Sequence, residues 1–92
     1  MIKIVFEADK NRSAAYDQEK FMGECTFSKS ENIWILDHTF VDSSYGGQGI
    51  AGKLVAKVAE EARNAGVKIV PLCPFAKKEF DNKEEYKDLL SK

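Results

Sequence analysis

The stretch that decides the fold is Gly46-Gly47-Gln48-Gly49-Ile50-Ala51. It separates an apolar, β-branched run over residues 33–41 from a helical pattern that begins near Gln48. A glycine-rich turn between a strand and a helix leaves backbone N–H groups uncovered and directed at one place, and the missing Cβ atoms let a bulky anion approach the main chain. The turn therefore predicts a phosphate-binding loop.

The chain before this loop predicts an antiparallel meander. The expected strands cover residues 2–6, 13–17, 21–27 and 33–41, and short polar turns join them. In the third strand, strict alternation predicts two faces. One face would carry Phe21, Gly23, Cys25 and Phe27, and the other Met22, Glu24 and Thr26.

The chain after the loop has a different period. Apolar residues recur at helical spacing up to Ala65, and Gly66 is placed to end that helix. Residues 67–72 form a short apolar run, so strand, helix and strand predict a right-handed parallel βαβ unit. Pro71 lacks an N–H, so this strand should leave regular pairing near its end. A C-terminal helix should begin at Pro74, which gives an α+β fold overall.

Composition restricts the functional classes. A chain of 92 residues predicts one domain, 1–92, and its net charge of −1 argues against the broad basic surface that non-specific nucleic-acid binding needs. The sequence contains no apolar run near the ~20 residues of a membrane helix and no signal-peptide pattern at its start, so we expect a cytoplasmic protein. Cys25 and Cys73 fit no metal spacing, so no metal is expected.

Two common phosphate motifs do not fit the loop, because neither G-x-G-x-x-G nor a Gly-Lys-Ser/Thr ending is present. The loop instead resembles the acyl-CoA pyrophosphate loop of the GCN5-related N-acetyltransferases, Q/R-x-x-G-x-G/A. Gly49 and Ala51 occupy the fourth and sixth positions. Gly46 stands where that family has Gln or Arg, so the resemblance does not supply this side-chain contact.

A small, single-domain, acetyltransferase-like subfamily is more similar still, over residues 11–90. The marks are His38-Thr39 before the loop, the loop itself, and Pro71-Leu72-Cys73-Pro74-Phe75 after the next strand. The resemblance implies a compact fold with two splayed parallel strands that binds acetyl-CoA or CoA. It also implies an amine acceptor, a protein or peptide amine among the options, and a monomer or weak homodimer.

The resemblance further implies a set of cofactor-binding positions. Backbone groups on the strand before the loop would pair with the pantetheine arm, and loop amides would meet the pyrophosphate. Lys53 would add charge at the rim. Lys77 would meet the 3′-phosphate or an acidic acceptor, or belong to a solvated face. The implied set is Thr39, Phe40, Val41, Gly46, Gly47, Gln48, Gly49, Ile50, Ala51, Lys53, Cys73, Pro74, Phe75 and Lys77.

Two residues are candidates for catalysis. Cys73 lies near the start of a helix, where a thiolate is stabilised, so it can accept the acyl group or simply line the tunnel as a small apolar residue. His38, the only histidine, can act as a base toward an amine or toward Cys73, or serve a structural hydrogen bond. The sequence thus supports an acetyltransferase, and alternatively a CoA-binding module without turnover.

Overall fold

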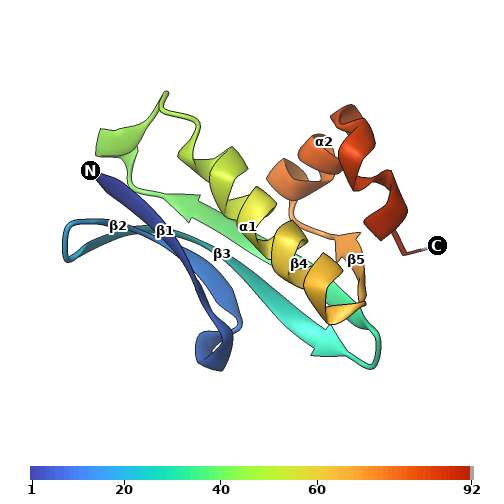
Figure 1. Cartoon of the computed structure of the whole chain (residues 1–92). Coiled ribbons are helices and arrows are strands. Elements are labelled where there is room, and N and C mark those ends of the chain that lie inside the picture. The colour runs from blue at the N-terminus through green and yellow to red at the C-terminus, as the bar shows by residue number, and fades with distance from the viewer. Residues whose placement is uncertain (92) are drawn as a thin grey trace.

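A computed structural model describes residues 1–91 as one five-stranded sheet with its longer helices on one face (Figure 1). The strands lie in chain order, with the first four antiparallel and β4 and β5 parallel. The strands are β1 (Ile2–Glu7), β2 (Arg12–Asp17), β3 (Lys20–Ser30), β4 (Ile33–Val41) and β5 (Lys68–Pro71). This confirms the predicted meander and βαβ unit.

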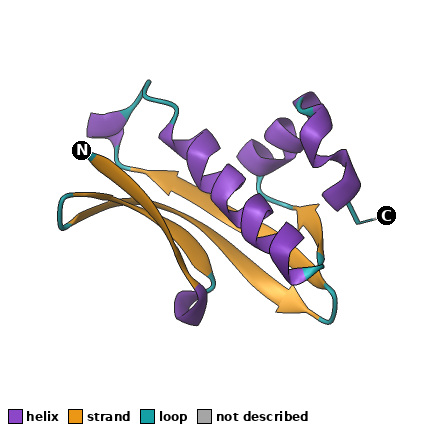
Figure 2. Ribbon diagram, viewed as in Figure 1, coloured by secondary structure: helices purple, strands orange, loops and turns teal. Residues whose placement is uncertain are grey.

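The helix α1 (Ile50–Ala65) lies across the inner face of the sheet, and α2 (Pro74–Asn82) lies beside it (Figure 2). Its apolar stripe is buried because it meets the strands, and Gly66 ends it with φ of 74°. Short 3₁₀ turns complete the structure: η1 (Ala8–Lys10), η2 (Ser43–Tyr45) and η3 (Glu84–Leu89). The buried stripe of α1 consists of Ile50, Leu54, Val55, Val58, Ala59 and Ala62.

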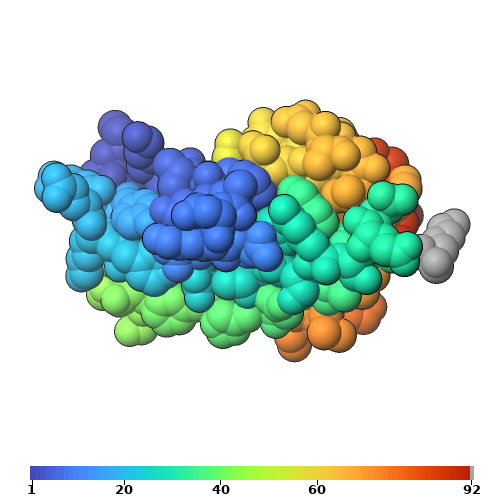
Figure 3. Space-filling view, turned by 90° about the horizontal axis from the view of Figure 1, so that it is seen from below, coloured from blue at the N-terminus to red at the C-terminus, as the bar shows by residue number. Residues whose placement is uncertain are grey.

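The opposite face of the sheet, called the outer face below, has no helix packed against it among residues 1–91. Seen from below, the near surface is formed largely by the blue to green strands of the first half of the chain (Figure 3). The connection between β1 and β2 is only the short turn η1 and Asn11. One face of the sheet therefore supports the core, and the other is open.

The parallel pair separates part-way along β4. Its register runs from Ile33 opposite Lys68 to Leu36 opposite Pro71. Beyond Leu36, β4 continues to Val41 without β5 and is paired with β3 only. Pro71 cannot extend the ladder because it has no N–H. The predicted divergence of the two strands at this proline is confirmed.

Two β-bulges correct the predicted side-chain alternation. Between β2 and β3 the pairing skips Met22, because Ala15 faces Gly23 while Tyr16 faces Phe21. An extra residue reverses the alternation beyond it. Met22 is therefore buried and Phe21 is 38% exposed, whereas the sequence predicted Phe21 on the face of Cys25 and Met22 on the other.

The second bulge lies in β4. Phe27 pairs with Leu36 and Thr26 pairs with His38, so Asp37 is the unpaired extra residue. Trp34 and Leu36 are buried on the inner face, and regular alternation would also turn His38 inward. The bulge instead turns Thr39 inward and leaves His38 exposed.

Candidate functional site

The glycine loop forms a pocket at the start of α1. Gly47 and Gly49 have φ of 79° and 72°, a backbone conformation that favours glycine, and no atom lies within 4 Å of a Cβ built on either. The pocket has a volume of about 260 Å³. It is lined by Val41, Tyr45, Gly46, Gly47, Gln48, Gly49, Ile50, Ala51, Gly52 and Phe75.

The pocket faces an uncapped helix N-terminus. Gly49 occupies the N-cap position without a side-chain hydrogen bond, and the first turn of α1 holds no acidic residue. The first bond of the helix ladder is from the amide of Lys53 to the carbonyl of Gly49. The amides before Lys53 have no intrahelical acceptor, so they remain available to an anion.

Tyr45, which lines the pocket, is held by a hydrogen bond to strand β2. The Tyr45 hydroxyl donates to Asp17 Oδ2 at 2.8 Å, and the N-terminal ammonium group lies 3.2 Å from Asp17 Oδ1. These contacts hold the pKa of Asp17 below its ordinary value, with the Tyr45 bond as the largest cause. Tyr45 is a pocket residue that the sequence reasoning missed, because its position depends on the 3₁₀ turn η2.

The separation of β4 and β5 begins at one carbonyl. Leu36 O accepts hydrogen bonds from both the Leu72 and the Cys73 amides, at 3.0 and 2.8 Å. Beyond this point the chain turns into α2 while β4 continues past Thr39 to Val41. The backbone of β4 from Asp37 onward therefore has no strand beside it on the β5 side within residues 1–91.

Cys73 lies at this divergence and contacts Thr39. Its Sγ lies 3.4 Å from Thr39 Oγ1, and the side chain is 7% exposed. Burial alone would raise the pKa of the thiol, but its hydrogen bond with Thr39 and those from the amides of Phe75 and Ala76 outweigh burial and lower the pKa. The surroundings of Cys73 thus make its thiol easier to ionise than an ordinary cysteine.

The second cysteine has the opposite character. Cys25 Sγ lies 3.7 Å from the same Thr39 Oγ1. Burial in the core raises the pKa of Cys25 to about 12. Of the two thiols beside Thr39, Cys73 has the lowered pKa and is the better candidate nucleophile.

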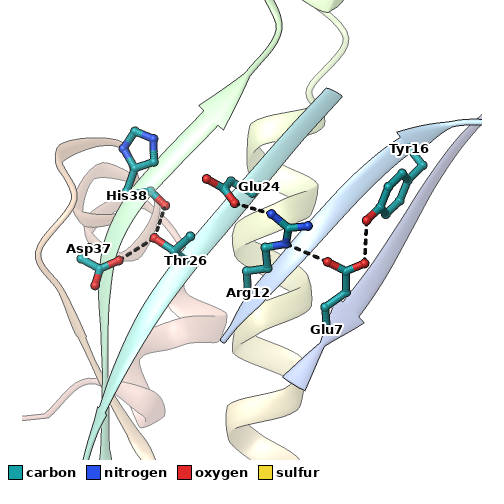
Figure 4. A network of polar contacts seen from close by, with 7 residues as sticks. All are labelled: Glu7, Arg12, Tyr16, Glu24, Thr26, Asp37 and His38. Carbon is teal, nitrogen blue, oxygen red and sulfur yellow. Dashed lines mark hydrogen bonds and ion pairs between the residues drawn. The ribbon is translucent and has the colours of Figure 1, made fainter. Parts of the chain in front are cut away.

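His38 does not join Cys73. The His38 side chain is exposed on the outer face. There the Thr26 hydroxyl donates to the Asp37 carboxylate and to the backbone carbonyl of His38 (Figure 4). The sequence hypothesis of a Cys73–His38 pair is therefore wrong in this structure, because the bulge at Asp37 places Thr39 beside the thiol instead.

Several other implied residues lie outside the pocket lining. Lys53 borders a separate hollow between α1 and β1, and Lys77 is exposed and pairs with Asp81 at 3.3 Å. Phe40 is 43% exposed on the outer face. Pro74 is the first residue of α2 and joins Cys73 to the pocket residue Phe75.

Two surveys of the described part of the chain complete the site. In residues 1–91 no three His, Cys, Asp or Glu side chains gather in a way that would hold a metal ion. None of the helices there has the length and apolar character needed to cross a membrane.

Comparison with known families agrees with this geometry. Residues 11–89 match the family model described as GCN5-related N-acetyl-transferase. The chain belongs to this family. Members of the family generally use acetyl-CoA and transfer its acetyl group to an acceptor.

Solved structures of similar proteins share this fold, and the first of them also supports the family assignment. An NMR structure of a GCN5-like protein from Staphylococcus aureus, described as a candidate N-acetyltransferase, is 31% identical, with a TM-score of 0.76 over 97% of this chain and 87% of that one. A crystal structure from meticillin-resistant S. aureus, of a protein of unknown function described as a candidate acetyltransferase, is 12% identical, with a TM-score of 0.68 over 100% and 97%.

A larger protein shares the fold at a lower TM-score. The ribosomal-protein-alanine N-acetyltransferase from Brucella melitensis biovar Abortus 2308 is 22% identical, with a TM-score of 0.58. The match covers 92% of this chain but only 65% of that longer protein. This likeness concerns the fold alone.

Proposed function

We propose that this protein binds acetyl-CoA and transfers the acetyl group to an amine. The observation that carries the proposal is the glycine pocket at the uncapped N-terminus of α1. An anion there gains hydrogen bonds from free amides and a favourable helix dipole, together typical of phosphate sites.

The pocket fits a pyrophosphate through its backbone. Gly47 and Gly49 leave open space where side chains would stand, and Gly46, which also lines the pocket, has no side chain. None of the lining residues is charged, so recognition would depend on amides rather than on lysine or arginine. This agrees with the loss of the Gln or Arg that the family loop has at the position of Gly46.

The divergence of β4 from β5 supplies a place for an extended arm. Thr39, Phe40 and Val41 offer backbone groups that no neighbouring strand of residues 1–91 uses on that side. Val41 and Phe75 line the pocket, while Thr39 and Cys73 lie two residues away from them along their respective segments. A ligand seated in the pocket and extended along β4 would therefore end near the Cys73 thiol.

Acetyl-CoA supplies an acetyl group activated as a thioester. In the proposed route the Cys73 thiolate attacks the thioester carbonyl carbon and displaces the CoA thiolate, which takes a proton from water. The acceptor amine then attacks acetyl-Cys73, loses a proton to water, and restores the thiolate. Once Cys73 is ionised, the Thr39 hydroxyl would turn and donate to the sulfur, before the first step and after the second.

A CoA-binding module without turnover is the second candidate. The open outer face favours it, because within residues 1–91 no helix forms a wall where an acceptor would be held. The same openness suits a bulky acceptor such as a protein amine. Binding alone does not separate these two functions.

Calorimetric titration with CoA tests the shared premise. Gly49→Ala adds a methyl group in the pocket at φ of 72°, and Gly66→Ala adds the same group at φ of 74° at the other end of α1. Both variants carry similar backbone strain, so only the first should lose CoA affinity, by about tenfold or more. Equal affinity for CoA in the two variants would contradict the proposed pocket.

Transfer is tested separately by mass spectrometry after incubation with acetyl-CoA. The proposed route predicts one acetyl group on wild-type protein, removed by hydroxylamine and absent in Cys73→Ser. An amine panel should then receive it. CoA binding without acetyl-Cys73 or any acetylated amine would favour the binding module.

A further inference from the structure

The two edges of the sheet differ in their backbone hydrogen bonding. At the β5 edge, Ser91 donates its amide to the carbonyl of Ile69 at 2.9 Å, and Ile69 and Leu90 form a parallel bridge. At the other edge, β1 pairs only with β2 among residues 1–91. A free strand edge exposes a row of backbone donors and acceptors that can pair with another chain.

The side chains of β1 give the strand an apolar inner face and a mixed, charged outer face. Ile2, Ile4 and Phe6 turn inward and are only partly buried against the core. Lys3, Val5 and Glu7 alternate with them on the outer face. Lys3 is the one exposed residue of this strand, and the apolar residues around it are half-buried.

A charged cluster on the outer face includes Glu7 at the end of β1. Arg12 lies between two carboxylates, 2.7 Å from Glu7 Oε1 and 2.9 Å from Glu24 Oε1 (Figure 4). The hydrogen bond from Tyr16, ahead of the contact with Arg12, holds the pKa of Glu7 below its ordinary value. One arginine thus contacts two carboxylates in this cluster, and Lys10 is a further cation that acts on Glu7.

Lys3 stands apart from this cluster within its own chain. It takes part in none of the ion pairs found in residues 1–91. It lies four residues from Glu7 on the same face of one strand, and four residues of extended chain span roughly 13 Å. Lys3 and Glu7 of the same strand are therefore too far apart to pair directly.

We propose that β1 pairs antiparallel with β1 of a second copy, across a two-fold axis at Val5. Lys3 then lies opposite the partner's Glu7, and this pair occurs twice by symmetry. Val5 faces its own copy on the outer face, and Ile4 faces the partner's Phe6 on the inner face. The result is a continuous ten-stranded sheet with the helices of both copies on one side.

Neighbouring registers lack this match. An axis at Ile4 would place Lys3 opposite Val5, and an axis at Phe6 would place Glu7 opposite Val5. A shift by a single residue would put the helices of the two copies on opposite faces of the sheet. Only the axis at Val5 pairs both charges and keeps the apolar residues together.

The inner side of the edge offers further complementary surface. A hollow of about 480 Å³ borders β1 and the exposed side of α1, with Ile4 and Ala56 as apolar lining and Lys53, Lys57 and Glu60 as charged lining. The pairing covers one six-residue strand and this hollow, so the interface is small. A weak dimer that forms at high protein concentration is the expected state.

Sedimentation velocity over a concentration series from low micromolar to millimolar tests the dimer. Wild type should shift from monomer to dimer. Lys3→Glu and Glu7→Lys should each dimerise about tenfold more weakly or worse, because each places like charges opposite one another twice. An equimolar mixture of the two variants should recover dimers, since the opposite-charge pairs return in the heterodimer.

A matched control keeps the test specific. Lys78→Glu makes the same charge change on α2, away from β1, and should dimerise like wild type. Circular dichroism melting of each variant shows whether Glu7→Lys remains folded after losing its contacts with Arg12 and Tyr16. A wild type that stays monomeric at millimolar concentration, or variants that dimerise unchanged and do not prefer each other, would overturn the proposal.

Discussion

Thr39 Oγ1 contacts two thiols, lying 3.4 Å from Cys73 Sγ and 3.7 Å from Cys25 Sγ. The hydroxyl has one proton to donate. With Cys73 protonated, Thr39 accepts from it and donates to Cys25; with Cys73 ionised, the hydroxyl can turn toward the thiolate. Thr39 thus contacts one thiol whose pKa is raised, Cys25, and one whose pKa is lowered, Cys73.

The first prediction concerns this hydroxyl. Thr39→Val keeps the shape of the side chain but removes the donor, so the pKa of Cys73 should rise and its alkylation by iodoacetamide at neutral pH should slow by about tenfold. Thr39→Ser retains the hydroxyl and should stay close to wild type. The pH profile of alkylation measures both. An unchanged profile in Thr39→Val would assign the lowered pKa to the amides of Phe75 and Ala76.

The second prediction concerns Cys25 and alkaline stability. Its folded-state pKa is raised from about 9 to about 12, so the unfolded chain ionises Cys25 first and stability should fall as pH rises above about 9. The loss continues through the window up to about 12. Cys25→Ala has no thiol to ionise at this position. The free energy of unfolding that it loses relative to wild type should therefore shrink as pH increases.

Urea unfolding at pH 7.5, 9 and 10 provides the measurement. The other titrating groups are shared by wild type and Cys25→Ala, so they cancel in the difference between the two free energies of unfolding. A difference that stays constant from pH 7.5 to 10 would contradict the burial of an un-ionised thiol.

The sequence predicted the order of elements well but not the faces of its strands. Glycine and proline marked the ends of α1 and β5 because each acts through its own backbone, at Gly49, Gly66 and Pro71. The bulges at Met22 and Asp37 depend on pairing between strands, which no local pattern reports. For this reason the position of Cys73 was predicted, whereas its neighbour turned out to be Thr39 and not His38.

The third prediction follows from that correction. Because His38 lies on the outer face, His38→Gln should leave the pKa of Cys73 and the yield of acetyl-Cys73 unchanged. The pH profile of alkylation and the mass of the acetylated protein measure these two quantities. A shift in the Cys73 profile of this variant would show that His38 reaches the thiol in solution.

The fourth prediction concerns a close approach of backbone strands at Gly23. A Cβ there would lie 2.8 Å from the carbonyl oxygen of Phe40 and 3.3 Å from Leu54 Cδ1. Gly23→Ala should therefore destabilise the fold by about 1–3 kcal/mol, since β4 or α1 must move. Gly46→Ala has φ of −61° and only an ordinary 3.4 Å contact, so it should be neutral or stabilising by up to about 1 kcal/mol. Urea unfolding compares the two, and equal stability would contradict the packing of β3 against β4.

The last prediction concerns the hydrogen bond between Tyr45 and Asp17. Tyr45→Phe keeps the aromatic wall of the glycine pocket but frees it from β2, so CoA affinity should fall by a few-fold as η2 becomes less fixed. Tyr16→Phe removes a similar bond, from Tyr16 to Glu7 Oε2 at 2.6 Å, on the outer face away from the pocket. This control should bind CoA like wild type. Equal losses in the two variants would mean that CoA affinity follows overall stability and not the position of the pocket wall.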